Sequence, residues 1–90
     1  METQEELEQI CDMLDRIEED TAIPRNIREN SKECEKLLLE SDDDLDVRIA
    51  SSIFKLEEMA DDPNIPLHGR TLIWNVISRL ESIKNEENSS

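Results

Sequence analysis

Residues 61–74 read DDPNIPLHGRTLIW, and this stretch decides how the chain is organised. It holds two of the three prolines and the only Gly, His and Trp of the 90 residues. A related stretch, DTAIPRNIR, occupies residues 20–28. Both contain the pattern D-x-x-I-P-x-x-x-R, and the second copy lies 42 residues after the first, so that Pro66 matches Pro24. The chain is therefore predicted to contain two copies of one corner between helices.

Each corner has residues suited to ending one helix and beginning the next. Proline favours the first turn of a helix, and it keeps the residue before it extended, so each isoleucine can point inward. The arginine four residues later is expected to reach back to the acid of its own corner. The alternative is a phosphate or carboxylate ligand bound by the two arginines. The corner residues are Asp20, Ile23, Pro24, Arg28, Asp62, Ile65, Pro66 and Arg70.

Apolar residues recur at the spacing i, i+3, i+4, i+7, which is typical of amphipathic helices. This spacing predicts helices over residues 4–19, 24–40, 45–60 and 66–84. The hairpins over 4–40 and 45–84 form one domain, residues 1–85, followed by a frayed polar tail at 86–90. A 42-residue period also suits HEAT-type repeats, but two repeats are too few for a solenoid. We therefore predict an all-α four-helix bundle built from two pseudo-repeated helical hairpins.

The charge balance restricts the choice of partner. Asp and Glu number 24 against 10 Lys and Arg, giving a net charge of −14. Such a surface repels phosphates, so we expect no direct binding of nucleic acid or of an anionic membrane. Apolar runs of at most three residues predict no membrane span. Two cysteines and no signal-peptide pattern indicate a cytoplasmic protein.

Few residues carry the patterns of known chemistry. Cys11 and Cys34 match Ile53 and Val76 in the repeat, which predicts buried apolar positions rather than a redox pair or a metal site. His68 would need a nucleophile or acid partner in reach to act as a general base, and we expect it to be exposed in the first turn of the last helix. The acid run at 42–46 lacks the Gly and the final acid of a calcium loop, although loose cation association there stays open. We predict no enzyme, no cofactor and no metal site.

One edge of the last helix is the candidate interaction surface. Trp74 and Leu67 lie near one border of the apolar arc of that helix, and Leu72 lies near the other. The default expectation for Trp74 is a buried core position. If the edge is instead exposed, it marks a partner or self-association surface, because Trp is enriched at binding hot spots. The candidate edge consists of Leu67, His68, Trp74 and Leu72.

Residues 62–75, read with residues 20–28, resemble a small archaeal family known only as uncharacterised protein family 0147. The resemblance extends from about Leu7 to Leu80. It implies an all-α four-helix bundle in an archaeal cytoplasm. It implies no activity and supplies no functional residues.

These observations favour a small non-catalytic protein-interaction or adaptor module. Its partner is expected to be another protein, with a basic one favoured, or a second copy of the chain. One alternative is a small-ligand or cation-binding protein that uses the arginine corners or the acid loops. A further alternative is an acidic nucleic-acid mimic that occupies a basic groove on another protein.

Overall fold

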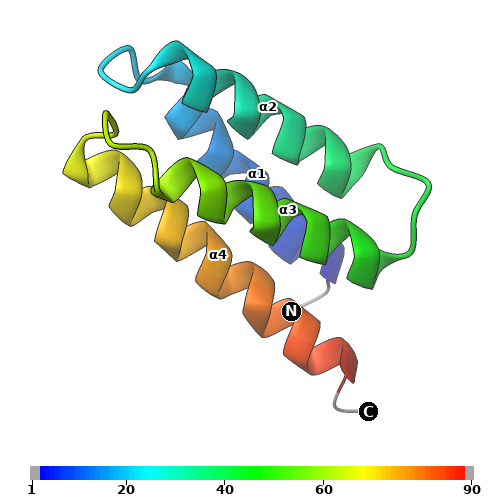
Figure 1. The fold of residues 1–90 in the computed structure, drawn as a ribbon. Helices are drawn as coiled ribbons and strands as arrows, with labels where there is room; N and C mark the ends of the chain where they lie inside the picture. The colour runs from blue at the N-terminus through cyan, green and yellow to red at the C-terminus, as the bar shows by residue number, and fades with distance from the viewer. Residues whose placement is uncertain (1–2, 89–90) are drawn as a thin grey trace.

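The computed structural model describes residues 3–88 and places four helices in them (Figure 1). They are α1 (Thr3–Glu19), α2 (Arg25–Leu39), α3 (Leu45–Ala60) and α4 (Leu67–Asn88). The described residues contain no strand. The all-α prediction is therefore confirmed.

The helices form a closed four-helix bundle. α1 packs against α2 and α4, and α3 packs against the same two helices. Figure 1 shows the α1–α2 and α3–α4 corners side by side at one end of the bundle, whereas the α2–α3 link lies at the opposite end. The bundle is thus two helical hairpins packed on each other, as the 42-residue repeat predicts.

The apolar stripe of each helix points to the bundle axis. Both cysteines lie in this core as free thiols, and burial raises the pKa of each to about 12. They are therefore protonated apolar groups at neutral pH, in agreement with the repeat argument. The largest fully buried side chains are Ile10, Leu14, Ile17, Ile23, Ile27, Leu38, Ile49, Leu56, Ile73, Ile77, Leu80 and Ile83.

Several helix ends differ from the predicted ones, most by a single residue. Pro24 precedes α2 with φ −53° and ψ 146°, and its carbonyl accepts the first N–H groups of the helix, so it is the N-cap and not a helical residue. α4 continues to Asn88, past the predicted end at residue 84. No Gly or Pro follows Lys84 and Glu is a good helix former, so the first part of the predicted tail stays helical. Residues 89–90 lie outside the described part.

The four described helices also lack the features of a membrane span. None of them combines the length and apolar character needed to cross a bilayer.

Candidate functional site

The two corners have the same hydrogen-bonded turn. Asp20 Oδ1 accepts the backbone N–H of Ala22 at 2.9 Å, and Asp62 Oδ1 accepts that of Asn64 at 2.8 Å. An aspartate that bonds the backbone two residues on forms an Asx turn, which replaces a backbone turn. The matching aspartates of the repeat thus have the same structural role.

The arginines support the corners, but through different acceptors from those predicted. Arg28 Nε donates to the carbonyl oxygen of Ile23 at 3.0 Å, and Arg70 Nε donates to that of Ala60 at 3.1 Å. The predicted ion pairs with Asp20 and Asp62 are therefore wrong. Helix ends and turns leave carbonyls without partners, and the planar guanidinium can reach them over the corner. Both arginines are partly buried against their own hairpin, which favours a structural role over ligand binding.

The aspartates instead join the two hairpins to each other. His68 Nε2 lies 2.7 Å from Asp20 Oδ2, and Asn26 Nδ2 donates to Asp62 Oδ2 at 3.2 Å. His68 and Asn26 are themselves 42 residues apart, so each corner contacts the acid of the other in a reciprocal pair. The N–H of Ala22 and the contact with His68 hold the pKa of Asp20 below its usual value. We call these two contacts the corner latch.

Gly69 allows close packing beneath the latch. A Cβ atom at this position would lie 3.2 Å from side-chain atoms of both Ile23 and Ile65, the two isoleucines of the corners. Its repeat partner is Ile27, which is fully buried. The glycine therefore makes room for both corner isoleucines at the junction of the hairpins.

The predicted interaction edge divides into two sides of α4. Trp74 is 45% exposed and Leu67 is 76% exposed, so the default expectation of a buried Trp is wrong. Leu72 packs against the core, and His68 is occupied by Asp20 on the α1 side. Positions seven apart share one helical stripe, whereas 68 and 72 lie well round the helix from 67 and 74. The four residues are not one surface.

The exposed residues beside Trp74 are uncharged. From Leu67 to Ser78 the exposed positions of α4 include no Asp, Glu, Lys or Arg, although 38% of the chain is charged. His68 belongs to the corner latch. The other exposed positions are called the Trp74 face from here on, and they are Leu67, Thr71, Trp74, Asn75 and Ser78.

The neighbouring helix α3 has an outer surface that is apolar and acidic. Phe54 is 66% exposed. Val47 is also exposed, and because it lies seven residues before Phe54 it is on the same side of the helix. The basic residues of α3 turn toward α2: Lys55 Nζ lies 2.7 Å from Glu33 Oε2, and Arg48 donates to the carbonyl of Leu38 at 2.8 Å. The exposed acids of α3 and its C-cap are Asp46, Glu57, Glu58 and Asp61.

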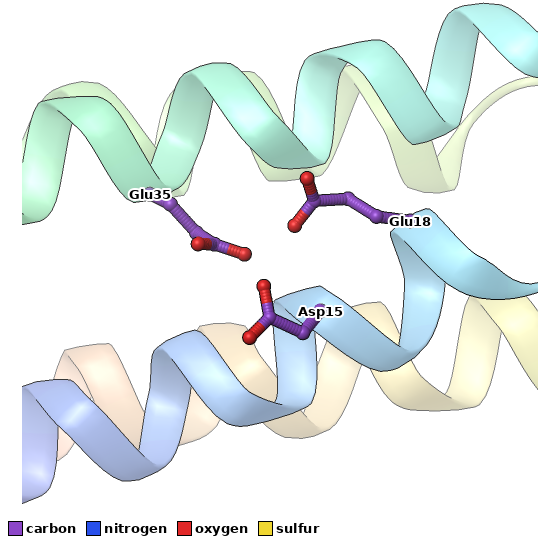
Figure 2. A group of neighbouring side chains, drawn as sticks. All are labelled: Asp15, Glu18 and Glu35. Atoms are coloured by element: carbon purple, nitrogen blue, oxygen red, sulfur yellow. The ribbon is translucent and has the colours of Figure 1, made fainter.

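Three carboxylates meet between α1 and α2 on another side of the bundle. Figure 2 shows Asp15 and Glu18 of α1 facing Glu35 of α2, and a carboxylate oxygen from each lies within 4.8 Å of the others. Burial, followed by the two neighbouring acids, raises the pKa of Glu35 to about 9. Glu35 is therefore protonated at neutral pH and can share its proton with the other two.

This acidic cluster was not predicted from the sequence. Its repeat partners are Glu57, Ala60 and Ile77, so an apolar residue replaces two of the three acids in the second hairpin. The mismatches of Glu18 with Ala60 and of Glu35 with Ile77 are the only sign of the cluster in the sequence. Three oxygen ligands could also hold a hard cation such as Ca²⁺, which prefers carboxylates. Half-exposed acids on so acidic a protein do not by themselves point to a cation.

Comparison with known proteins identifies the family. A family model described as "Uncharacterised protein family (UPF0147)" matches residues 1–83. The chain belongs to this family. A UPF0147 protein of Methanosarcina acetivorans is 46% identical over 83 residues, covering 92% of this chain and 86% of that protein. One from Methanothermobacter thermautotrophicus is 42% identical over 80 residues, covering 89% and 78%.

Two crystal structures share the fold of this UPF0147 member. The protein of unknown function MMP1188 has a TM-score of 0.87 and 42% identity, covering 93% of this chain and 96% of its own. A UPF0147 protein from Thermoplasma acidophilum has a TM-score of 0.84 and 35% identity, covering 89% and 94%. The resemblance noted from the corners is confirmed. The function of the family is unknown.

Proposed function

We propose that this UPF0147 protein is a non-catalytic protein-interaction module of the cytoplasm that binds a basic partner protein through the Trp74 face. The observation that carries the proposal is the half-exposed Trp74 within an uncharged stretch of α4 on a protein of net charge −14. Interface cores are depleted of charged residues and enriched in aromatic ones, and Trp is over-represented among the few side chains that carry most of the binding energy.

The surroundings of the face favour a basic partner over a second copy of the chain. Four acids of α3 and its C-cap are exposed, while Lys55 and Arg48 of α3 are engaged with α2. A second copy would bring a further charge of −14 against this rim, which like-charge repulsion disfavours. A cationic protein would be attracted to the rim and could cover the uncharged centre.

The rest of the surface supports a non-catalytic role. A hollow between α2 and α3 is open to solvent, and Lys55 on its wall is paired with Glu33. His68, the single histidine, is held by Asp20, and both cysteines are buried with raised pKa values. The thiols are thus enclosed, and the hydrogen bonds of the described residues join His68 to Asp20 but to no Ser, Thr or Cys that it could activate as a general base.

Capture experiments with matched variants test the proposal. The immobilised full chain would be incubated with lysate from an archaeon that encodes a family member, beside Leu67→Ser, Trp74→Gln and the control Leu39→Ser. Leu39 is 45% exposed on α2, away from the face. We expect a basic protein that the wild type and the control retain and that both face variants lose. Equal retention by all four chains would overturn the proposal.

Salt separates this proposal from an acidic nucleic-acid mimic. Binding centred on Trp74 and Leu67 should persist at 1 M NaCl, because apolar contacts do not weaken with salt. Binding by surface charge alone should disappear there, since the Debye length falls to about 3 Å. Capture that is lost at 1 M NaCl and is insensitive to the face variants would instead support the mimic.

A further inference from the structure

The spacing of the Trp74 face indicates what kind of segment covers it. Leu67, Thr71, Trp74 and Ser78 follow one another at intervals of four, three and four residues. This is the a/d spacing of a helix seam that receives the side chains of a second helix. α4 already packs against α1 and α3 through its other sides, so this seam is an additional, unpartnered one.

A helix suits this surface better than an extended strand. The face covers the N-terminal half of α4, where the carbonyl groups and, from Thr71 onward, the N–H groups of the backbone are paired within the helix. An extended peptide gains its affinity mainly from backbone hydrogen bonds to a sheet edge, and the described residues of this chain contain no strand. Recognition here must use side chains, as in the packing of one helix on another.

The charges beside the seam specify the flanks of that helix. α3 lies alongside α4 and exposes Glu57 and Asp61, and the next exposed acid along α4 is Glu81. The basic residues of this part of the bundle are engaged inside it, with Arg70 on the Ala60 carbonyl and Arg79 on Gln9 of α1. Cations on the partner would therefore meet acids without competition from nearby lysines or arginines.

We propose that the Trp74 face binds one amphipathic helix of the partner, which places apolar residues on the α4 seam and Lys or Arg toward the acids of α3. This inference rests on the proposed function and adds the form of the bound segment. The seam from Leu67 to Ser78 spans roughly 16 Å at 1.5 Å per residue, so a helix of about three turns covers it and one of about four turns extends just past its ends.

Synthetic peptides test the inference directly. A peptide of about 14 residues, with Leu at i, i+3, i+4, i+7 and Lys elsewhere, would be titrated into the full chain at 0.15 M NaCl. Trp74 is the only Trp, so its emission reports on the face itself. With this peptide we expect a saturable blue shift of the Trp74 emission. A control peptide of the same composition, with Leu and Lys alternating, should bind about tenfold more weakly. A Leu/Glu peptide of the same pattern should not bind.

Variants connect the binding to the face and to its rim. Leu67→Ser should weaken binding of the Leu/Lys helix about tenfold, as loss of a hot-spot side chain does, and Leu39→Ser should leave it unchanged. Glu57→Gln should weaken peptide binding by less than Leu67→Ser does, and it should make the binding less dependent on salt. Equal binding of the two Leu/Lys patterns, or no effect of Leu67→Ser, would overturn the helical partner. If lysate capture still depends on the face in that case, the proposed function stands and only the form of the segment is wrong.

Self-association is measured with the same proteins. Sedimentation equilibrium of the wild type at increasing concentration should show a monomer in 0.15 M NaCl. A dimer that dissociates on Leu67→Ser would show that a second copy occupies the seam, and the basic helical partner would be wrong.

Discussion

Ser31 and Ser52 place hydroxyl groups in the core of the bundle. Both side chains are fully buried, and neither hydroxyl has a hydrogen-bond partner. Their repeat partners are Ile73 and Ile10, so the same positions are apolar in the other hairpin. A buried hydroxyl without a partner costs about 1–3 kcal/mol, which makes these two serines weak points of an otherwise apolar core.

We therefore expect Ser52→Ala to stabilise the protein by about 1 kcal/mol, which raises the melting temperature of a domain of this size by about 4–8 °C. The control is Ser51→Ala, because Ser51 is exposed on the same helix and has the same gain in helix propensity. Thermal unfolding followed by circular dichroism measures both. Equal shifts in the two variants would show that the hydroxyl of Ser52 has a partner in solution.

Glu35 makes stability depend on pH. Its pKa is raised from an ordinary 4.5 to about 9, mainly by burial. Between these values the folded protein keeps a proton that the unfolded chain releases, so the free energy of unfolding falls as the pH rises from about 4.5 to 9. Glu35→Gln removes this titration and keeps the shape of the side chain.

We expect Glu35→Gln to raise the melting temperature by about 5 °C at pH 8 and to leave it unchanged at pH 4, a modest figure because the cluster is partly exposed. Glu57→Gln is the matched control, since Glu57 is exposed and occupies the position that Asp15 has in the first hairpin. The control should change little at either pH. A gain for Glu35→Gln that is equal at pH 4 and pH 8 would contradict the raised pKa.

Among the elements, the corners connect local turns with the docking of the hairpins. Asp20 makes two contacts, one with its own turn through Ala22 and one with His68 of the other hairpin. Asp20→Ala should therefore lower the melting temperature more than His68→Ala, which breaks only the latch. His68→Asn should recover part of the loss, because an Asn makes the equivalent contact at position 26.

Lowering the pH should remove the stability that the contacts of Asp20 contribute. The pKa of Asp20 lies below its ordinary 3.8, so its contribution is present above that pH and is lost as the pH falls through the lowered value. Melting temperatures of Asp20→Ala and wild type should therefore converge as the pH falls below 3.8 and through the lowered pKa. A constant difference between them over that range of pH would show that the contacts do not depend on the charge of Asp20.

Gly69 sets how closely α4 can approach the two corners. Gly69→Val should destabilise the protein by about 1–3 kcal/mol, because the added atoms overpack Ile23 and Ile65. Asn75→Val, at an exposed position of the same helix, controls for the propensity of Val and should cost under 1 kcal/mol. Urea unfolding gives both values. Full stability of Gly69→Val would mean that the corner isoleucines can move aside.

The helices and the corners could be predicted from the sequence because their causes are local. Apolar spacing defines each helix, and the match of Pro24 with Pro66 defines the repeat. The acceptors of Arg28 and Arg70 could not be predicted, since they depend on which carbonyls remain free at each corner. Nearness in the sequence pairs Asp20 and Asp62 with these arginines, but docking of the hairpins brings the two acids to residues 48 and 36 positions away in the chain.

The exposure of Trp74 depends on the whole bundle for a similar reason. The apolar arc of the last helix is wider than two neighbouring helices can cover. The sequence alone does not determine which edge of this arc stays exposed to solvent. In the bundle, Leu72 packs on the core and Trp74 does not. The acidic cluster depends on packing as well, because Asp15, Glu18 and Glu35 come together only when α1 packs on α2.

At the scale of the whole molecule, uneven placement of charge should make the protein sensitive to salt. The net charge is −14, and several of the few basic side chains are used for internal contacts. Repulsion between the remaining acids opposes the compact state, and salt screens it. The melting temperature should therefore rise by several degrees between 0.02 and 0.5 M NaCl, at about 4–8 °C for each kcal/mol of relieved repulsion.

A charge reversal separates this screening from general effects of salt on apolar surface. Glu57→Lys replaces an exposed acid close in sequence to Glu58, Asp61 and Asp62, so it should raise the melting temperature in 0.02 M NaCl. The gain should shrink at 0.5 M NaCl, where the Debye length is only a few ångströms. A gain that is equal at both salt concentrations would come from packing or helix propensity instead. The same acids would then not be repelling one another, and their attraction for the cationic flank of a bound helix would be correspondingly weak.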